Sequence, residues 1–260
     1  MGMRASHAPG TFSWVDLATT DATAAKSFYG GLFGWEMRDG DSGGGAVYTT
    51  CHLDGHAVCG LFEMPDDMRA TGVPPNWTSY VTVAGADAAA ARARELGGET
   101  VQDAFDVLDA GRTAVLKDPQ GAVFAVWQPR SRIGAERVND VGCLCMNELA
   151  TTDMEAARSF YEGLFGWTTE MVDTGPDDPP MGLAHNDGTL NASFGAVEDG
   201  APPHWRPYFT VESVEATLQR VRELGGSELH GPLEIFDGTI ALVLDPQGAL
   251  FALFEGEVDP

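Results

Sequence analysis

Alternating apolar and polar residues, separated by helical patterns, predict a chain of short strands and helices. Residues 12–17 read as a strand, and Asp21 is placed to cap a helix over 22–33. The apolar positions of that helix recur at the spacing of one buried face, at Ala25, Phe28, Tyr29 and Leu32. Short strands follow near 47–53 and 57–62.

The same pattern then restarts. A strand is predicted at 80–84, a helix at 86–96 that two glycines close, and further strands at 113–116 and 122–127. The turn between the last two strands reads Asp-Pro-Gln-Gly, with Pro and Gly at the positions that a type I turn favours. The first half of the chain therefore contains two β-α-β-β-β units in succession.

A sequence motif of the first half is repeated in the second half at a constant offset. Residues 16–21 read Asp-Leu-Ala-Thr-Thr-Asp and residues 148–153 read Glu-Leu-Ala-Thr-Thr-Asp, and each is followed by Ser-Phe-Tyr and Gly-Leu-Phe-Gly-Trp. Later segments match with small slips, among them Pro-Pro-x-Trp, Arg-Glu-Leu-Gly-Gly and Asp-Pro-Gln-Gly-Ala. The chain is therefore predicted to hold two copies of one domain, at 1–132 and 133–260, and four β-α-β-β-β modules.

The composition narrows the range of partners. With 43% hydrophobic residues, each half of the chain has enough apolar side chains for its own core. A net charge of −24 argues against binding to nucleic acid or anionic membranes, and no apolar run is long enough to span a bilayer. The start of the chain lacks the apolar core of a signal peptide, so we expect a cytoplasmic protein. We expect a small-molecule ligand, and a monomer in which the two copies form a pseudo-dimer, or a homodimer.

Three features together carry a family resemblance: the first strand, the Asp-capped helix with Ser-Phe-Tyr-x-x-Leu-Phe-Gly-Trp, and the Asp-Pro-x-Gly turn before the last strand. They resemble the glyoxalase, bleomycin-resistance and extradiol dioxygenase group, the vicinal oxygen chelate superfamily, twice over nearly the whole chain. The doubled form is similar to tandem glyoxalase-like proteins of actinobacteria. The resemblance implies an α+β fold in which four β-α-β-β-β modules form curved, cup-like sheets. It leaves the chemistry open, because the superfamily includes isomerases, dioxygenases, thiol transferases and antibiotic binders that catalyse nothing.

Metal-dependent members of that superfamily carry a His or Gln on the first strand, a His at the start of the second module and a Glu on the last strand. The resemblance places these ligands at Trp14, Thr78 and Ala125 in the first copy and at Met146, Arg206 and Ala252 in the second. None of the six offers the His, carboxylate or thiolate that a catalytic divalent ion requires. The neighbours Gln128, His204 and Glu255 are too few to replace them. We therefore expect no metal site and no cofactor.

Alternation along the first strand of each copy puts one acid on the same face as the first ligand position. Phe12, Trp14 and Asp16 share this face in the first copy. The matching face of the second copy holds Leu144, Met146 and Glu148. If this face lines the cup, Asp16 and Glu148 are catalytic candidates, because a carboxyl group with a shifted pKa in an apolar cavity suits general acid–base chemistry. The alternative is a structural role, in which each carboxylate accepts hydrogen bonds from a nearby Arg or from backbone amides.

The remaining candidates for contact with a ligand surround these acids. Arg206, beside His204, has a guanidinium that suits an anionic or carbonyl-bearing ligand, and Thr78 is its counterpart in the first copy. The alternative for Arg206 is to pair with the acidic surface. Trp77 and Trp205 occupy matching positions, as core or pocket-wall residues. The predicted substrate-binding set is Phe12, Trp14, Trp77, Thr78, Met146, His204, Trp205 and Arg206.

Three hypotheses follow for function. The first is an enzyme that acts without a metal on a small carbonyl or aromatic molecule, by lyase or isomerase chemistry in which Asp16 or Glu148 transfers the proton. The second is a non-catalytic protein that sequesters an antibiotic or a toxic metabolite. The third is a metal-dependent glyoxalase or dioxygenase with a shifted ligand set. Loss of the two acids separates the first two hypotheses, because a binder needs only its aromatic walls.

Overall fold

The computed structural model describes residues 2–41, 47–173, 181–198, 200–235 and 238–258. The first half forms β1 (Phe12–Thr19), α1 (Ala22–Phe33), β2 (Glu36–Asp41), β3 (Val47–Leu53), β4 (His56–Glu63), α2 (Asp66–Ala70), β5 (Asn76–Thr82), α3 (Ala86–Glu95), β6 (Glu99–Val107), β7 (Gly111–Lys117) and β8 (Val123–Pro129). The second half forms β9 (Leu144–Thr151), α4 (Met154–Phe165), β10 (Thr168–Val172), β11 (Met181–Asn186), β12 (Thr189–Ala196), β13 (His204–Thr210), α5 (Val214–Glu223), β14 (Ser227–Ile235), β15 (Gly238–Leu244) and β16 (Leu250–Gly256).

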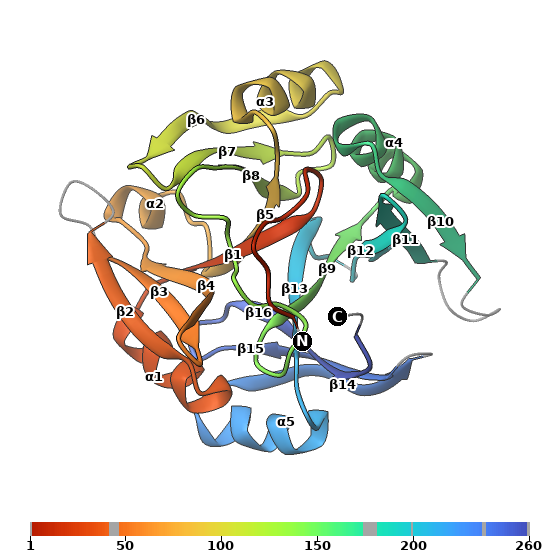
Figure 1. Ribbon diagram of the computed structural model, residues 1–260. Helices are drawn as coiled ribbons and strands as arrows, with labels where there is room; N and C mark the ends of the chain where they lie inside the picture. The colour runs from red at the N-terminus through yellow and green to blue at the C-terminus, as the bar shows by residue number, and fades with distance from the viewer. Residues whose placement is uncertain (1, 42–46, 174–180, 199, 236–237, 259–260) are drawn as a thin grey trace.

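Each half folds into a sheet of its own (Figure 1). The strand order is β2-β3-β4-β1-β5-β8-β7-β6 in the first sheet and β10-β11-β12-β9-β13-β16-β15-β14 in the second. The leading strands of the two modules, β1 and β5 or β9 and β13, run antiparallel at the centre of each sheet. The prediction of an α+β fold with two tandem domains of β-α-β-β-β modules is confirmed, and each cup forms within one copy.

The local signals in the sequence account for most of these elements. Asp21 accepts a hydrogen bond from the Ala24 N–H at the start of α1, as a helix cap does, and Gly34 ends that helix in the left-handed conformation (φ 72°). The strands β2 and β6 and the short helix α2 lie outside the predicted segments. Both strands lie at edges of the first sheet, where most of β6 is exposed and shows no apolar alternation.

The hydrophobic core lies between the two domains, on the convex faces of the sheets. One cluster joins Phe28 of α1 to Val221 of α5 and Phe251 of β16. A second cluster joins Phe124 of β8 to Phe160 of α4. Helices α1 and α5 pack together, as do α3 and α4, so each domain completes the core of the other. The concave faces therefore point away from each other as two separate cups.

Two hydrogen-bonded chains cross this core in opposite directions. The Trp77 indole N–H donates to the Tyr29 hydroxyl (3.2 Å), which donates to Asp245 of the other domain (3.1 Å). The matching chain runs through Trp205, Tyr161 and Asp118, with distances of 2.8 and 3.0 Å. Burial raises the pKa of both aspartates, and bonds from backbone N–H groups of their turns oppose that effect in part. The motifs that repeat in the sequence thus hold the two copies together.

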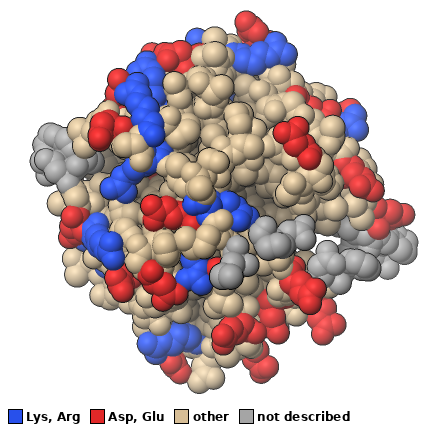
Figure 2. All heavy atoms as spheres, viewed as in Figure 1, with Lys and Arg blue, Asp and Glu red and all other residues tan. Residues whose placement is uncertain are grey.

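The surface carries its excess negative charge in a dispersed form. On the face in Figure 2, acidic side chains lie mostly around the periphery, with Lys and Arg between them. None of the described helices has the length and apolar character needed to cross a membrane.

Candidate functional site

Alternate residues of β1 line the first cup. Trp14 and Asp16 face the concave side, because Val15 between them points into the inter-domain core. On the neighbouring strand β5, Tyr80 lies directly across from Trp14, and Thr78 lies across from Asp16. The centre of this cup therefore combines a carboxyl group with aromatic side chains.

Asp16 is buried in the first cup, with 6% of its surface exposed. The Trp14 indole N–H donates to Oδ1 of Asp16 (2.6 Å), and the Tyr48 hydroxyl of β3 donates to the same oxygen (2.5 Å). The Tyr80 hydroxyl adds a further hydrogen-bonding interaction with the carboxyl group. Trp14, Tyr48 and Tyr80 are themselves only half-buried, so a ligand in the cup can reach them.

The protonation of Asp16 follows from this enclosure. Burial raises the pKa of the Asp16 carboxyl group, and the hydrogen bonds from Tyr48, Tyr80 and Trp14 lower it in part. Burial and the neighbouring charge of Asp16 hold the pKa values of Tyr48 and Tyr80 well above the usual range, so both phenols stay neutral donors. Asp16 thus keeps its proton to a higher pH than a free aspartic acid does.

Gly60 of β4 makes room for this arrangement. It pairs with Asp16 across the parallel strands β1 and β4. A Cβ atom at Gly60 would lie 1.9 Å from the Tyr48 hydroxyl oxygen and 2.4 Å from Oδ1 of Asp16. Any side chain at this position would therefore displace the hydrogen-bonded pair.

The second cup holds its acid differently, in an ion-paired cluster. The Arg206 guanidinium donates to Oε1 of Glu148 (3.1 Å) and to Glu198 (2.7 Å), and the Tyr208 hydroxyl donates to Oε2 of Glu148. Arg206 is 4% exposed. Burial opposes its charge, but the attraction of Glu148, Tyr208 and Glu198 outweighs that effect and raises the Arg206 pKa above its usual range. Both carboxyl oxygens of Glu148 are therefore already engaged.

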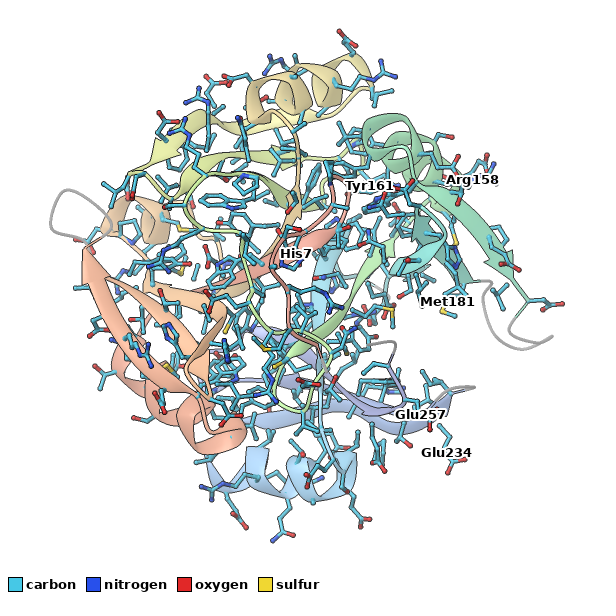
Figure 3. All side chains as sticks on the ribbon, in the orientation of Figure 1. His7, Arg158, Tyr161, Met181, Glu234 and Glu257 are labelled. Carbon is cyan, nitrogen blue, oxygen red and sulfur yellow. The ribbon has the colours of Figure 1, made fainter. Side chains whose placement is uncertain are left out.

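An apolar floor surrounds that cluster. It is formed by Tyr208, Leu242, Ala252 and Phe254, with Cys145, Met146, Ile240, Leu250 and Val258 packed against them. Figure 3 shows Met181 of β11 on one side of this concave face and Glu234 of β14 on the other. The second cup thus offers a hydrophobic surface with one fixed polar cluster.

Three residues of the predicted substrate-binding set do not line a cup, and the structure corrects their placement. A β-bulge between Phe12 and Trp14 turns Phe12 into the inter-domain core, where its ring lies 4.9 Å from that of Trp205. Trp77 and Trp205 lie on the convex faces of β5 and β13 and are buried in the two core clusters. The alternation of residues 12–17 did not reveal the bulge. The matching positions of Trp77 and Trp205 in the two copies did not show which face of the sheet they occupy.

The other predicted residues lie on or near the concave faces. Thr78 lies opposite Asp16, Met146 opposite Tyr208, and Arg206 opposite Glu148. His204 begins β13, and its ring nitrogen Nδ1 lies 3.0 Å from the Pro202 carbonyl oxygen. Their roles in binding stay predictions.

Sequence reasoning missed the tyrosines that hold the two acids. Tyr80 and Tyr208 follow the matched tryptophans by three residues in both copies, so the repeat itself carried a signal for them. Tyr48 and Glu198 come from segments without a match in the other copy, and only the fold brings them to Asp16 and Arg206.

The residues present do not fit a divalent metal. Trp14 pairs with Tyr80 and Tyr80 with Ala125, so the structure puts Tyr80, rather than Thr78, in the row where the superfamily has its ligands. The same row of the second copy is Met146, Tyr208 and Ala252. No group of three or more His, Cys, Asp or Glu in the described part of the chain is arranged to hold a metal ion. Gln128 and Glu255 instead accept hydrogen bonds from the first N–H groups of α3 and α5 (3.1 and 2.8 Å).

The comparisons with known proteins agree with the fold and with its division into two similar domains. The model of a glyoxalase-like domain matches residues 14–127 and again 144–254. The chain is 37% identical over 257 residues to the Mycobacterium tuberculosis protein named "Putative glyoxylase CFP32", with 98% of each covered. It is 36% identical over 261 residues to the anthracycline biosynthesis protein DnrV of Streptomyces peucetius, covering 95% of this chain and 94% of that one.

Solved structures are similar in fold at low sequence identity. The Mn(II)-bound glyoxalase of Novosphingobium aromaticivorans superposes with a TM-score of 0.67 at 16% identity, covering 96% of this chain and 84% of that one. The 2,3-dioxygenase LapB of Pseudomonas sp. KL28 superposes with a TM-score of 0.65 at 16% identity, covering 96% and 93%. At this identity the likeness concerns the fold and not the chemistry.

Proposed function

Because this chain belongs to the glyoxalase-like domain family in both of its halves, we propose that its cups bind a small organic molecule with a carbonyl or aromatic group, and that Asp16 moves a proton in the first cup. The observation that carries the proposal is the buried Asp16 carboxyl group with a raised pKa inside a wall of reachable aromatic donors. Such a carboxyl group can exchange a proton closer to neutral pH than an exposed one.

The hydrogen bonds suggest roles within the first cup. Trp14 and Tyr48 hold Oδ1 of Asp16, and Oδ2 is the oxygen that takes the proton in the proposed step. In the proposed step the carboxylate takes a proton from a carbon next to a carbonyl group, and the electrons of the broken C–H bond form an enolate. The Tyr80 hydroxyl interacts with the Asp16 carboxylate before the step. Once Asp16 is protonated, this hydroxyl donates to the enolate oxygen instead. Return of the proton to another carbon of the enolate completes an isomerisation. If the carbon next to the enolate carries a leaving group, the enolate electrons instead form a C=C bond as the bond to that group breaks, and the departing group takes the proton, which completes an elimination; either route restores the carboxylate.

The second cup is proposed to bind without chemistry. Both oxygens of Glu148 are occupied, by Arg206 and Tyr208, so no carboxyl oxygen is free to accept a proton. Its apolar floor suits a flat hydrophobic molecule. Two relatives are named as anthracycline biosynthesis proteins. We therefore propose a polycyclic aromatic molecule as the ligand to test first in both cups.

Calorimetric titration with 1,4-dihydroxyanthraquinone tests the proposal for both cups. We expect saturable binding that Tyr80→Phe weakens at one site and Tyr208→Phe weakens at the other, because each substitution removes a hydroxyl that holds the acid of one cup. Asp103→Asn, on the exposed face of β6, is the control and should bind as the parent does. Unchanged binding in both tyrosine variants would place the ligand outside the cups.

Removal of metals is expected to change neither binding nor turnover. The reason is chemical. The strand positions at which the superfamily has its metal ligands carry indole, phenol, thioether and methyl groups in this chain. Elemental analysis of protein purified without a chelator should find no stoichiometric Mn, Fe, Ni or Zn. A bound metal that EDTA removes together with activity would restore the hypothesis of a shifted ligand set.

A further inference from the structure

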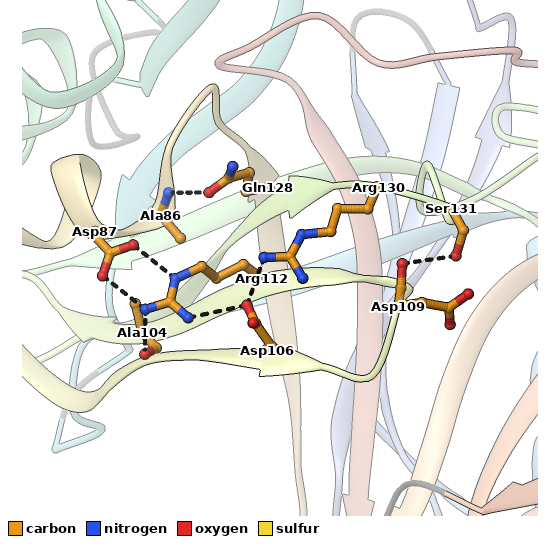
Figure 4. Close-up of polar contacts among 9 residues, drawn as sticks. All are labelled: Ala86, Asp87, Ala104, Asp106, Asp109, Arg112, Gln128, Arg130 and Ser131. Carbon is orange, nitrogen blue, oxygen red and sulfur yellow. Dashed lines mark hydrogen bonds and ion pairs between the residues drawn. The ribbon is translucent and has the colours of Figure 1, made fainter.

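Almost every cation of this acidic protein has an acidic partner. Of the 15 Lys and Arg residues, all but three form ion pairs among the described residues. Figure 4 shows the usual pattern: Arg112 lies between Asp87 and Asp106, and Arg130 binds the same Asp106. The three exceptions are Arg4, Arg94 and Arg132.

Two of these exceptions line the same hollow. Arg4 belongs to the N-terminal arm (residues 2–11) and Arg132 to the linker between the domains (residues 130–143), and both border a hollow of about 310 Å³. Among the described residues, the Arg4 guanidinium donates only to the Met3 carbonyl (3.2 Å), and the Arg132 guanidinium forms neither a hydrogen bond nor an ion pair. The third, Arg94, lies away from this hollow and donates to Thr100 (2.7 Å).

The backbone around the hollow is fixed, although the two guanidinium groups are not paired. The Arg4 N–H donates to the Glu136 carbonyl (2.9 Å), which ties the arm to the linker. The Trp127 indole N–H donates to the Arg132 carbonyl (3.0 Å). Figure 1 shows the arm and the linker side by side in the middle of the molecule. The backbone thus holds the two arginines beside one hollow, and no carboxylate of the described residues forms an ion pair with either.

The acid that borders the hollow does not neutralise them. The Glu136 carboxylate accepts the Ala57 N–H (2.9 Å) and lies 3.9 Å from Nδ1 of His56. Charge is also unevenly divided along the chain: residues 1–132 hold ten basic and 16 acidic residues, and 133–260 hold five and 23. On the face in Figure 2, most of the Lys and Arg lie over the first domain. An anion therefore meets the least repulsion on this side of the molecule.

We propose that this hollow binds a small organic dicarboxylate, with Arg4 and Arg132 each taking a carboxylate. Guanidinium groups match the planar geometry of carboxylates, and the side chains of Met3, Ala57 and Ile133 supply apolar contact for the carbon chain between them. The site is separate from both cups, since neither Asp16 nor Glu148 borders it. A ligand here would join the arm to the linker.

Calorimetric titration of the full chain with glutarate tests this site. We expect glutarate to bind, with an affinity that falls as salt is added, and its neutral counterpart glutaramide not to bind. Arg4→Gln and Arg132→Gln should each raise the dissociation constant for glutarate about tenfold, the loss of one charge-assisted carboxylate contact. Arg94→Gln is the matched control, an unpaired arginine outside the hollow, and should leave it unchanged.

Three results would overturn the proposal: no binding of glutarate by the parent at millimolar concentration, equal binding of glutaramide, or an unchanged affinity in the Arg4→Gln/Arg132→Gln double variant. Neither guanidinium forms a hydrogen bond or ion pair with a side chain in the described part of the protein, so the variants should unfold at the parent's temperature. An unchanged unfolding temperature then separates loss of the binding site from misfolding. Binding of 1,4-dihydroxyanthraquinone should also persist in these variants, which separates this site from the cups.

Discussion

Trp205→Ala is expected to lower the free energy of unfolding by about 3–5 kcal/mol, the usual cost of removing a fully buried Trp side chain. Trp205 is 4% exposed in the core between the domains, and its ring lies 5.2 Å from that of Tyr161. Its indole N–H also donates to the Tyr161 hydroxyl, which in turn donates to Asp118 of the first domain. The substitution therefore leaves a cavity and breaks a buried hydrogen-bonded chain at the same place.

Urea unfolding followed by circular dichroism measures this loss. Because the core is shared, the parent and the variant should each unfold in one transition that includes both domains. Trp127→Ala is the control: Trp127 is half-buried on the concave side of β8, and its loss should cost only about 1–2 kcal/mol. Two separate transitions, of which only one moves in Trp205→Ala, would mean that the domains are tethered and not mutually stabilising.

Asp16→Asn is expected to lower turnover by about 10²–10⁴-fold, the contribution of a positioned general base, with little change in ligand affinity. The amide keeps the size of the side chain and can still accept the bonds from Trp14 and Tyr48 at its oxygen. It cannot accept a proton. Steady-state kinetics on a substrate found through the binding experiments would measure the loss.

The raised pKa of Asp16 gives that prediction a test that needs no substrate. The folded chain binds this proton more tightly than the unfolded chain, because burial raises the pKa. The stability it contributes is therefore full below the ordinary Asp pKa of about 4 and is lost as pH rises through the raised folded value. The difference in unfolding free energy between parent and Asp16→Asn should follow this curve. In the active protein, turnover should rise over the same pH range, since the base must be ionised.

Asp103→Asn is the matched control for the acid, because Asp103 is an exposed aspartate on β6. It should change neither turnover nor the pH profile. Full activity of Asp16→Asn would remove the acid–base role and leave the binding role for both cups.

More of the fold than of the candidate site could be predicted from the sequence. The repeat and the caps at Asp21 and Gly34 depend on residues close together in the chain, so a single sequence reveals them. The bulge before Trp14 depends on pairing with β5, which is distant in the sequence, and it moved Phe12 out of the cup. Alternation therefore put Trp14 and Asp16 on the concave face, where the structure has them, but it put Phe12 on the wrong face.

The residues that contact Asp16 and Arg206 could not be predicted from the sequence for a related reason. Tyr48 reaches Asp16 from β3, and Glu198 reaches Arg206 from the segment after β12. Neither contact has a characteristic spacing in the sequence, because the curvature of the sheet decides which strands come near. The repeat signalled that Trp77 and Trp205 have one role in common, but the interface between the domains, which is that role, exists only in the folded chain.

The crossed Tyr–Asp contacts have a consequence for how the two halves can diverge. In a symmetric dimer of identical subunits, every substitution appears in both sites at once. Here the two copies are separate stretches of one chain, so a cup can change alone while the shared interface stays matched. The interface has kept Tyr29 with Asp245 and Tyr161 with Asp118, whereas one cup holds a protonatable acid among phenols and the other an acid locked to an arginine. With two copies in one chain, a substitution in one cup therefore leaves the other cup unchanged.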